Sequence, residues 1–143
     1  MTQLTQHFSL QEFSHSETAI RLSIDNDPPL QVVAALKRTA AGMESVRQLL
    51  NNNAIRISSG YRCPLLNEAV HGQPTSQHMK GEAVDFTCFT QGTPRQIVQR
   101  IMNSDVVFDQ CILEFDAWIH ISFSDHPRRQ VLIIDQFGKR NFS

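Results

Sequence analysis

Residues 76–85 read Ser-Gln-His-Met-Lys-Gly-Glu-Ala-Val-Asp, which places a loop histidine seven residues before an aspartate. From residue 82 to residue 88, polar and apolar side chains alternate as they do in a half-buried strand. The apolar face of this strand would consist of Val84, Phe86 and Cys88. The stretch therefore predicts a strand that presents Asp85 on its opposite, open face, with His78 in the loop before it.

Residues 118–123 repeat the alternating pattern. Their apolar face would consist of Ile119, Ile121 and Phe123. If the two strands share a sheet, Asp85 and His120 converge above it and His78 reaches in from the loop. Two histidines and one carboxylate without a fourth protein ligand are typical of catalytic zinc sites, which keep one position open for water. The alternative is that these side chains are hydrogen-bonded structural groups.

The remaining pattern predicts an α+β fold, because helices come first and strands gather late in the chain. Helices are expected over residues 9–21, 30–50 and 64–70 and from residue 94 onward; strands are expected over 55–57, 82–88, 108–115, 118–123 and 130–134. The sheet should be small and mainly antiparallel. The length of 143 residues predicts a single domain over residues 1–143.

Local signals fix several of these boundaries. Ser9 and Glu12 have the spacing of a capping box, and Phe8 and Phe13 flank it as a hydrophobic staple would. Thr93 precedes a proline at the first helical position, which predicts the start of another helix. Gly81 is expected to permit a positive φ or a close backbone approach.

Composition excludes several classes of function. The net charge is −1, and the basic residues are scattered rather than gathered into the stripe that a nucleic-acid interface needs. No run approaches the roughly 20 apolar residues of a membrane span. The N-terminal stretch has no basic segment followed by an apolar one, so synthesis in the cytoplasm without a signal peptide is expected. Three cysteines without a paired spacing argue against a disulfide framework.

Three motifs follow one another as Ser59-Gly-Tyr-Arg-Cys-Pro64, Ser76-x-His-x-x-Gly-x-Ala-x-Asp85 and Trp118-Ile-His120, after an opening Phe8-Ser-Leu-Gln-Glu-Phe13. Together they resemble the M15 family of zinc peptidases, which includes D-Ala-D-Ala carboxypeptidases and phage endolysin-type peptidases. The resemblance covers most of the chain. It implies the zinc fold that this family shares with the zinc domain of hedgehog signalling proteins.

The resemblance also implies a role for individual residues. It assigns Zn²⁺ to His78, Asp85 and His120. It further implies that Arg62 binds and polarises the substrate carbonyl, a task that suits a fixed guanidinium because it can stabilise a developing oxyanion. Without the resemblance, a surface salt bridge would be the simpler interpretation of Arg62.

The general base should be a carboxylate near the metal. Many cell-wall members of the family place a glutamate three residues before the last histidine ligand, but Ala117 stands there in this chain. The hedgehog-like spacing is six, which makes Glu114 the candidate. Even spacing would put Glu114 on the same face as His120 if the hairpin loop between them holds an odd number of residues. Asp116 is the alternative base, and a turn residue is its structural interpretation.

Two further residues are candidates for contacting the substrate. Trp118 stands where many carboxypeptidases have a histidine, and it is expected to wall the cleft. Ser76 is expected to orient His78 and to contribute to the substrate site. The predicted function is a zinc metallopeptidase acting on peptidoglycan stem peptides, as a carboxypeptidase or as an endolysin-type endopeptidase from a phage or prophage. A catalytically silent zinc-stabilised binding module and a metal-free structural protein of a phage particle are the alternatives.

Overall fold

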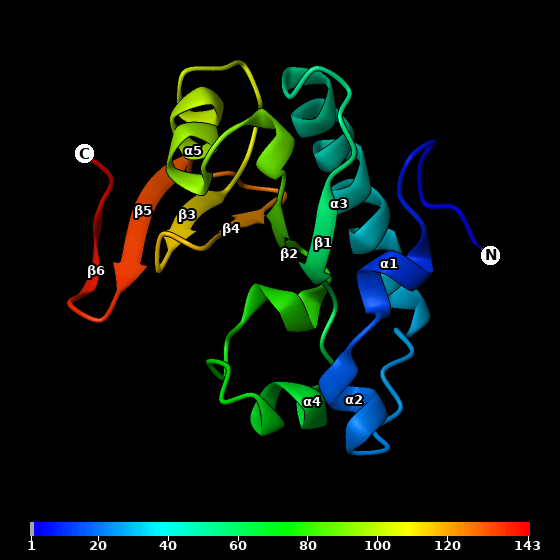
Figure 1. The fold of residues 1–143 in the computed structure, drawn as a ribbon. Helices are drawn as coiled ribbons and strands as arrows, with labels where there is room; N and C mark the ends of the chain where they lie inside the picture. Colours follow the sequence, from blue (N-terminus) through cyan, green and yellow to red (C-terminus); the bar gives the residue numbers. More distant parts are fainter. Residues whose placement is uncertain (1) are drawn as a thin grey trace.

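The computed structural model describes residues 2–143 as a mixed α+β fold built on one six-stranded sheet (Figure 1). The strands are β1 (Arg56–Ser59), β2 (Ala83–Thr87), β3 (Gln110–Glu114), β4 (Trp118–Ser122), β5 (Gln130–Asp135) and β6 (Gly138–Asn141). Their order is β1-β2-β4-β3-β5-β6, and every neighbouring pair is antiparallel except β3 and β5, which are parallel. The expected α+β class and mainly antiparallel sheet are confirmed.

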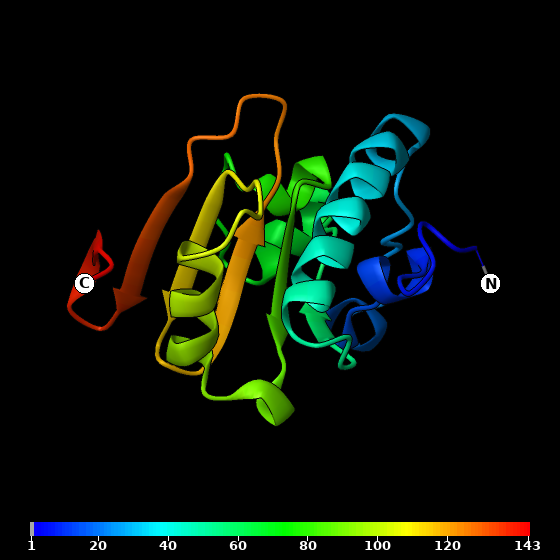
Figure 2. The same ribbon diagram turned by 90° about the horizontal axis from the view of Figure 1, so that it is seen from above.

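Helices lie on both sides of this sheet (Figures 1 and 2). They are α1 (Leu10–Ser14), α2 (Glu17–Arg21), α3 (Leu30–Leu49), α4 (Pro64–Ala69) and α5 (Pro94–Met102), with the short 3₁₀ turns η1 (Gln77–Lys80) and η2 (Phe89–Gln91). Helices α3 and α5 cover one face, whereas α4 and the segment with η1 lie beyond the other (Figure 2). Among residues 2–143, no helix combines the length and the apolarity that crossing a membrane requires.

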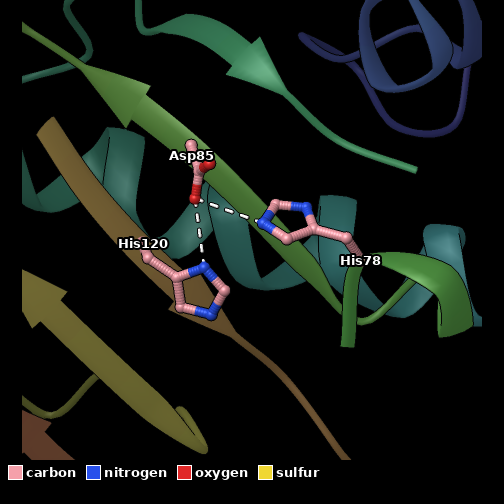
Figure 3. Close-up of side chains that lie close together, drawn as sticks. All are labelled: His78, Asp85 and His120. Atoms are coloured by element: carbon pink, nitrogen blue, oxygen red, sulfur yellow. Dashed lines mark hydrogen bonds and ion pairs between the residues drawn. The ribbon is translucent and has the colours of Figure 1, made fainter. Parts of the chain in front are cut away.

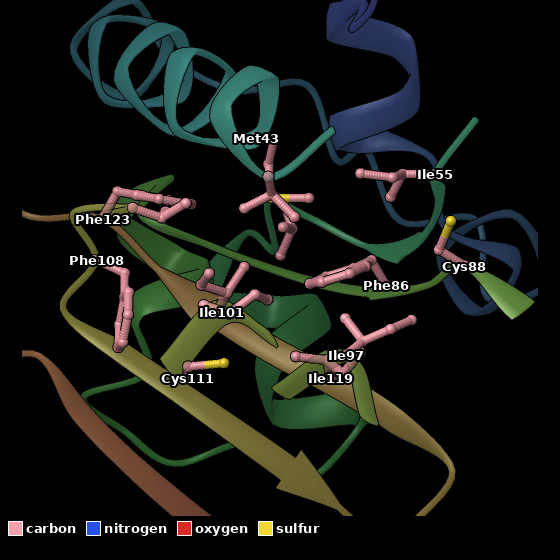
Figure 4. Close-up of a cluster of buried hydrophobic side chains, with 14 of the residues drawn as sticks. Met43, Ile55, Phe86, Cys88, Ile97, Ile101, Phe108, Cys111, Ile119 and Phe123 are labelled. Carbon is pink, nitrogen blue, oxygen red and sulfur yellow. The ribbon is translucent and has the colours of Figure 1, made fainter. Parts of the chain in front are cut away.

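The hydrophobic core fills the layer between α3, α5 and the sheet (Figure 4). Helix α3 contributes apolar residues at helical spacing, and α5 contributes a second stripe beside it. The fully buried members of these stripes include Leu36, Ala40, Met43 and Val46 from α3 and Ile97, Val98 and Ile101 from α5. Because this layer buries one face of β2 and β4, the other face is left for polar side chains.

The N-terminal helix differs from its prediction, because the expected helix over residues 9–21 is broken into α1 and α2. The capping box of Ser9 and Glu12 and the Phe8–Phe13 packing are both present. His15 is extended, and the Ser16 side chain caps the start of α2. Carbonyl groups at the end of α1 accept tertiary hydrogen bonds instead, since Phe13 O binds Tyr61 N at 2.6 Å and Ser14 O binds Asn26 Nδ2 at 2.9 Å.

The chain also closes with a strand that the pattern did not predict. Strand β6 follows a turn and pairs with β5, and all four of its residues are exposed. It contains no apolar alternation, so only its pairing with β5 defines it. Gly81 ends η1 with φ +74°, which confirms the expected left-handed glycine, and a Cβ there would press on Val32 and Leu36 of α3.

Candidate metal centre

Asp85 and His120 stand opposite each other on the two central strands β2 and β4. Their sequence neighbours Val84, Phe86, Ile119 and Ile121 are fully buried against the helices. Because side chains alternate along a strand, this burial turns Asp85 and His120 to the opposite face. There His120 Nδ1 lies 3.0 Å from Asp85 Oδ1. The strand pattern predicted this placement correctly.

His78 reaches the same point from η1, which lies just before β2. The Ser76 side chain accepts a hydrogen bond from His78 N at 3.2 Å and caps this short turn. On the imidazole, Nδ1 donates to Gly60 O at 2.7 Å, which leaves Nε2 facing Asp85 Oδ1 at 3.3 Å. A backbone carbonyl that holds one ring nitrogen fixes the tautomer in which the other nitrogen can bind a metal.

The three side chains fit a metal ion by the chemistry and spacing of their donor atoms (Figure 3). One ligand atom from each residue lies within 4.8 Å of the other two. Burial lowers the pKa of His78 despite the opposing charge of Asp85, so the histidine favours the neutral form that binds metals. Burial also opposes ionisation of Asp85, but His78 and His120 outweigh it and hold the pKa of Asp85 far below its usual range.

These residues belong to an open cleft with a volume of about 840 Å³. Its lining includes Arg62, Ser76, Glu114 and Trp118, which the sequence proposed for substrate binding or catalysis. It also includes the exposed His71, for which the sequence motifs predicted no role. The fold thus brings these four residues and the three metal-ligand candidates to one concave surface, whereas Asp116, the alternative base, is not among the lining residues.

Arg62 lies just after β1 in the chain, and two hydrogen bonds hold it beside His78. Its backbone N–H donates to His78 O at 3.1 Å, and its Nη2 donates to Ser76 Oγ at 3.3 Å. Its Nε is buried and has no hydrogen-bond partner within residues 2–143. Burial lowers the pKa of the guanidinium, whereas Asp85 and Glu114 oppose that shift. A buried cation with an unused donor is suited to a carbonyl or carboxylate of a ligand.

Glu114 is the last residue of β3 and stands opposite Trp118 across a three-residue hairpin loop. The odd loop length places Glu114 on the face of His120, as the spacing argument required. Burial raises the pKa of Glu114, and the negative charge of Asp85 adds to this effect. Asp116 instead pairs with Arg95 at 3.1 Å, with a side chain that is 66% exposed. The geometry therefore favours Glu114 over Asp116 as the carboxylate of the cleft.

Sequence reasoning missed the residues that hold this site in place. Asn26 donates to Tyr61 O at 2.9 Å and accepts from Cys63 N at 2.8 Å, so it fixes both neighbours of Arg62. Gln77 donates to the buried Asp109 at 2.9 Å and so anchors the turn that carries His78. These partners are 35, 37 and 32 residues apart along the chain, and no local pattern marks them.

Two histidines and an aspartate that line an open cleft thus form a donor set that could hold a metal ion. Residues 6–122 match the family model of Peptidase M15, and the chain belongs to this family. The resemblance seen in the sequence motifs is thereby confirmed, and the chain is a member of a family of peptidases. A search of curated proteins found no match to it.

Proposed function

We propose that the protein is a zinc metallopeptidase that hydrolyses peptide bonds in bacterial peptidoglycan stem peptides. The observation that carries the proposal is the convergence of His78, Asp85 and His120 in the cleft of a chain from the Peptidase M15 family. In this proposal residues 1–143 form one zinc peptidase domain with the hedgehog-like zinc fold. The protein is made in the cytoplasm and acts on the cell wall as a phage or prophage product.

Zinc, when bound, supplies a Lewis acid that polarises the scissile carbonyl and increases the acidity of a water molecule. His78 Nε2, an Asp85 carboxylate oxygen and His120 Nδ1 are the atoms that would hold the ion, and the Gly60 carbonyl keeps His78 in the required tautomer. A site with three protein ligands leaves room for water and substrate, which distinguishes it from a structural zinc site.

The residues around the metal ligands transfer the proton, stabilise the developing negative charge and shape the cleft. Glu114 accepts the proton of the attacking water at its carboxylate and passes it to the leaving amine. Its burial supports this role, since a raised pKa brings a carboxyl group closer to neutral pH. Arg62 donates to the oxygen on which negative charge develops, and Ser76 holds the Arg62 guanidinium in place. Trp118 forms a wall of the cleft at the Glu114 end.

Mass spectrometry of muropeptides tests the proposal directly. Purified peptidoglycan is incubated with protein whose zinc content has been measured, with and without a chelator. We expect new products that disappear with the chelator and return when zinc is restored, and their masses identify the bond that is cut. Release of D-Ala would indicate a carboxypeptidase, and stem fragments would indicate an endopeptidase. Absence of products from zinc-loaded protein would favour a silent binding module of the same fold.

Replacement of the base separates the peptidase from that binding module. We expect Glu114→Gln to lower kcat by about 10²–10⁴-fold, the usual contribution of a positioned general base, while zinc binding is retained. Asp116→Asn is the matched control, because Asp116 is in the same hairpin but pairs with Arg95. If the two variants release muropeptide products at equal rates, Glu114 is ruled out as the base.

A further inference from the structure

Arg128 occupies one end of the cleft, on the loop that joins β4 to β5. Its side chain is 51% exposed, although it is tied to a carboxylate that is almost fully buried. Residues 77 and 110 line the same end of the cleft, whereas Glu114 and Trp118 line the other. Since Arg128 is two residues before Gln130, which pairs with Gln110, it lies at the opposite end of β3 from Glu114.

The buried carboxylate of Asp109 fixes the orientation of this guanidinium. Arg128 Nε donates to Asp109 Oδ1 at 2.8 Å and Nη2 donates to Asp109 Oδ2 at 2.7 Å, in the bidentate geometry that suits an arginine fork. The backbone N–H of Arg128 adds a third bond to Oδ1 at 2.9 Å. Asp109 is only 2% exposed and also accepts a hydrogen bond from Gln77. The arginine is therefore built into the scaffold beside the candidate metal ligands.

One edge of the guanidinium remains available. Within residues 2–143, Arg128 Nη1 takes part in no hydrogen bond, while Nε and Nη2 are both engaged. An arginine that is already oriented loses little conformational entropy when it binds a ligand, because its rotamers are fixed in advance. An ordinary surface ion pair has no need of a buried carboxylate, whose removal from water is unfavourable.

The lining at this end of the cleft includes the cation Arg128 and no acidic residue, with Asp109 and Glu82 behind it as the negative charges that face the guanidinium. The acidic residues of the lining are Asp85, which belongs to the metal cluster, and Glu114 at the far end. Gln110 and Glu114 are four positions apart in β3, a distance of about 13 Å along an extended strand. A group bound by Arg128 therefore lies at the opposite end of β3 from Glu114.

We propose that Arg128, held by Asp109, is a specificity-determining residue that binds a side-chain carboxylate of the peptide substrate. This inference rests on the proposed peptidase function and adds the substrate class, an acidic peptide. The carboxylate contacts the protein on the η1 side of the metal ligands and accepts a hydrogen bond from Arg128 Nη1. A peptide that carries carboxamides in place of its side-chain carboxylates is a poorer ligand, because a neutral amide makes a weaker bond to a cation.

The test uses two synthetic stem peptides that differ only in whether their side-chain carboxylates are free or converted to carboxamides. Binding to the zinc-loaded, full-length Glu114→Gln protein is measured by calorimetry, so that the peptides stay intact. We expect the acidic peptide to bind about tenfold more tightly, in keeping with one hydrogen bond to a charged group. Equal affinity for the two peptides would overturn the inference.

A double substitution removes the arginine without leaving a buried charge unpaired. In Asp109→Asn/Arg128→Gln, the two peptides should bind with equal affinity. Arg129→Gln is the control, since it removes the same charge from the neighbouring residue, whose guanidinium donates to Met102 O and Ser104 O. The control should keep the tenfold preference. The preference is a ratio within one protein, so it does not depend on how much of each variant is folded.

The outcomes distinguish this inference from the proposed function. The unsubstituted protein could cleave both peptides while the binding measurement shows no preference. That result would refute the role of Arg128 and would still support the peptidase function. A binding preference that depends on Arg128, together with no cleavage of either peptide, would refute the proposed peptidase function. It would still support carboxylate binding by Arg128. A preference that persists in the double variant would assign the selectivity to other residues.

Discussion

Asn26 is a single buried side chain on which the position of Arg62 depends. Its amide group donates to Ser14 O and Tyr61 O and accepts from Cys63 N, so it joins the end of α1 to the segment after β1. Arg62 lies between the two residues of that segment that Asn26 holds. No other side chain among residues 2–143 bonds to the backbone of both neighbours of Arg62.

Asn26→Ala should therefore lower both stability and turnover. We expect the free energy of unfolding to fall by about 2–4 kcal/mol, because several buried backbone groups lose their partner. The expected kinetic effect is a lower kcat/KM with zinc content unchanged, since the metal ligands keep their own contacts. Asn53→Ala is the control, because Asn53 donates to the nearby Leu50 O and Asn51 O and accepts only a long 3.4 Å bond from the exposed Thr90 hydroxyl, away from the candidate site. Denaturant titration with equal midpoints for the two variants would contradict the role of Asn26.

At the scale of elements, the β3–β4 hairpin carries Glu114, the proposed general base, and an aromatic edge of the cleft. Its loop is strained, because Phe115 and Asp116 both adopt left-handed backbone angles, with φ of 56° and 52°. Neither is a glycine, and a bulky residue in this region is an outlier that costs about 1–3 kcal/mol. Phe115 is 51% exposed and its ring lies 5.6 Å from that of Trp118. The strained turn thus holds two aromatic rings beside Glu114.

Phe115→Asn should stabilise the protein while weakening substrate binding. Asparagine tolerates the left-handed region, so we expect the free energy of unfolding to rise by about 1 kcal/mol. The loss of one aromatic wall should raise KM for the muropeptide substrate severalfold. Phe137→Asn is the control in the β5–β6 turn, where Phe137 is 83% exposed and has no positive φ. Thermal unfolding measures the effect. An equal gain in stability in both variants would contradict the interpretation that the backbone of Phe115 is strained.

The elements that the sequence predicted are those that bury a regular apolar stripe. Helix α3 and strands β2 and β4 do so, and strand alternation was enough to place Asp85 and His120 on one face. The break after α1 and the edge strand β6 depend instead on hydrogen bonds between distant segments, which periodicity does not record. For the same reason, Asn26 and Asp109 were missed, although both position residues of the candidate site.

At the scale of the whole molecule, a polar network joins α3 to the cleft. Arg38 on α3 pairs with Glu82 at 3.1 Å, Glu82 accepts from Gln77, and Gln77 donates to Asp109. Asp109 then binds Arg128 on the β4–β5 loop. Hydrogen bonds from Arg128 lower the pKa of Asp109 from 3.8 to about 2. A carboxylate with a lowered pKa stabilises the fold while it is ionised, and this contribution is lost as the pH falls.

Asp109→Asn should therefore have an effect that depends on pH. At neutral pH we expect the free energy of unfolding to fall by about 2 kcal/mol, because the substitution removes one partner of a buried ion pair. The difference from the unsubstituted protein should shrink as the pH falls from about 4 to about 2, where Asp109 itself becomes protonated. Asp125→Asn is the control, because its carboxylate, 77% exposed, makes only a surface pair with Arg38. Denaturant unfolding at several pH values measures the stability of both variants. A loss of stability in Asp109→Asn that does not change with pH would contradict the role of the ionised Asp109.

The central pairing of β2 with β4 has a consequence for when the candidate metal ligands come together during synthesis. Asp85 and His120 are separated by 35 residues and lie opposite each other on β2 and β4. Closing such a loop requires non-local contacts that form late in folding. A nascent chain therefore holds an incomplete donor set until residue 120 has left the ribosome. The three donor atoms of the candidate metal centre therefore come together only after β2 and β4 have paired.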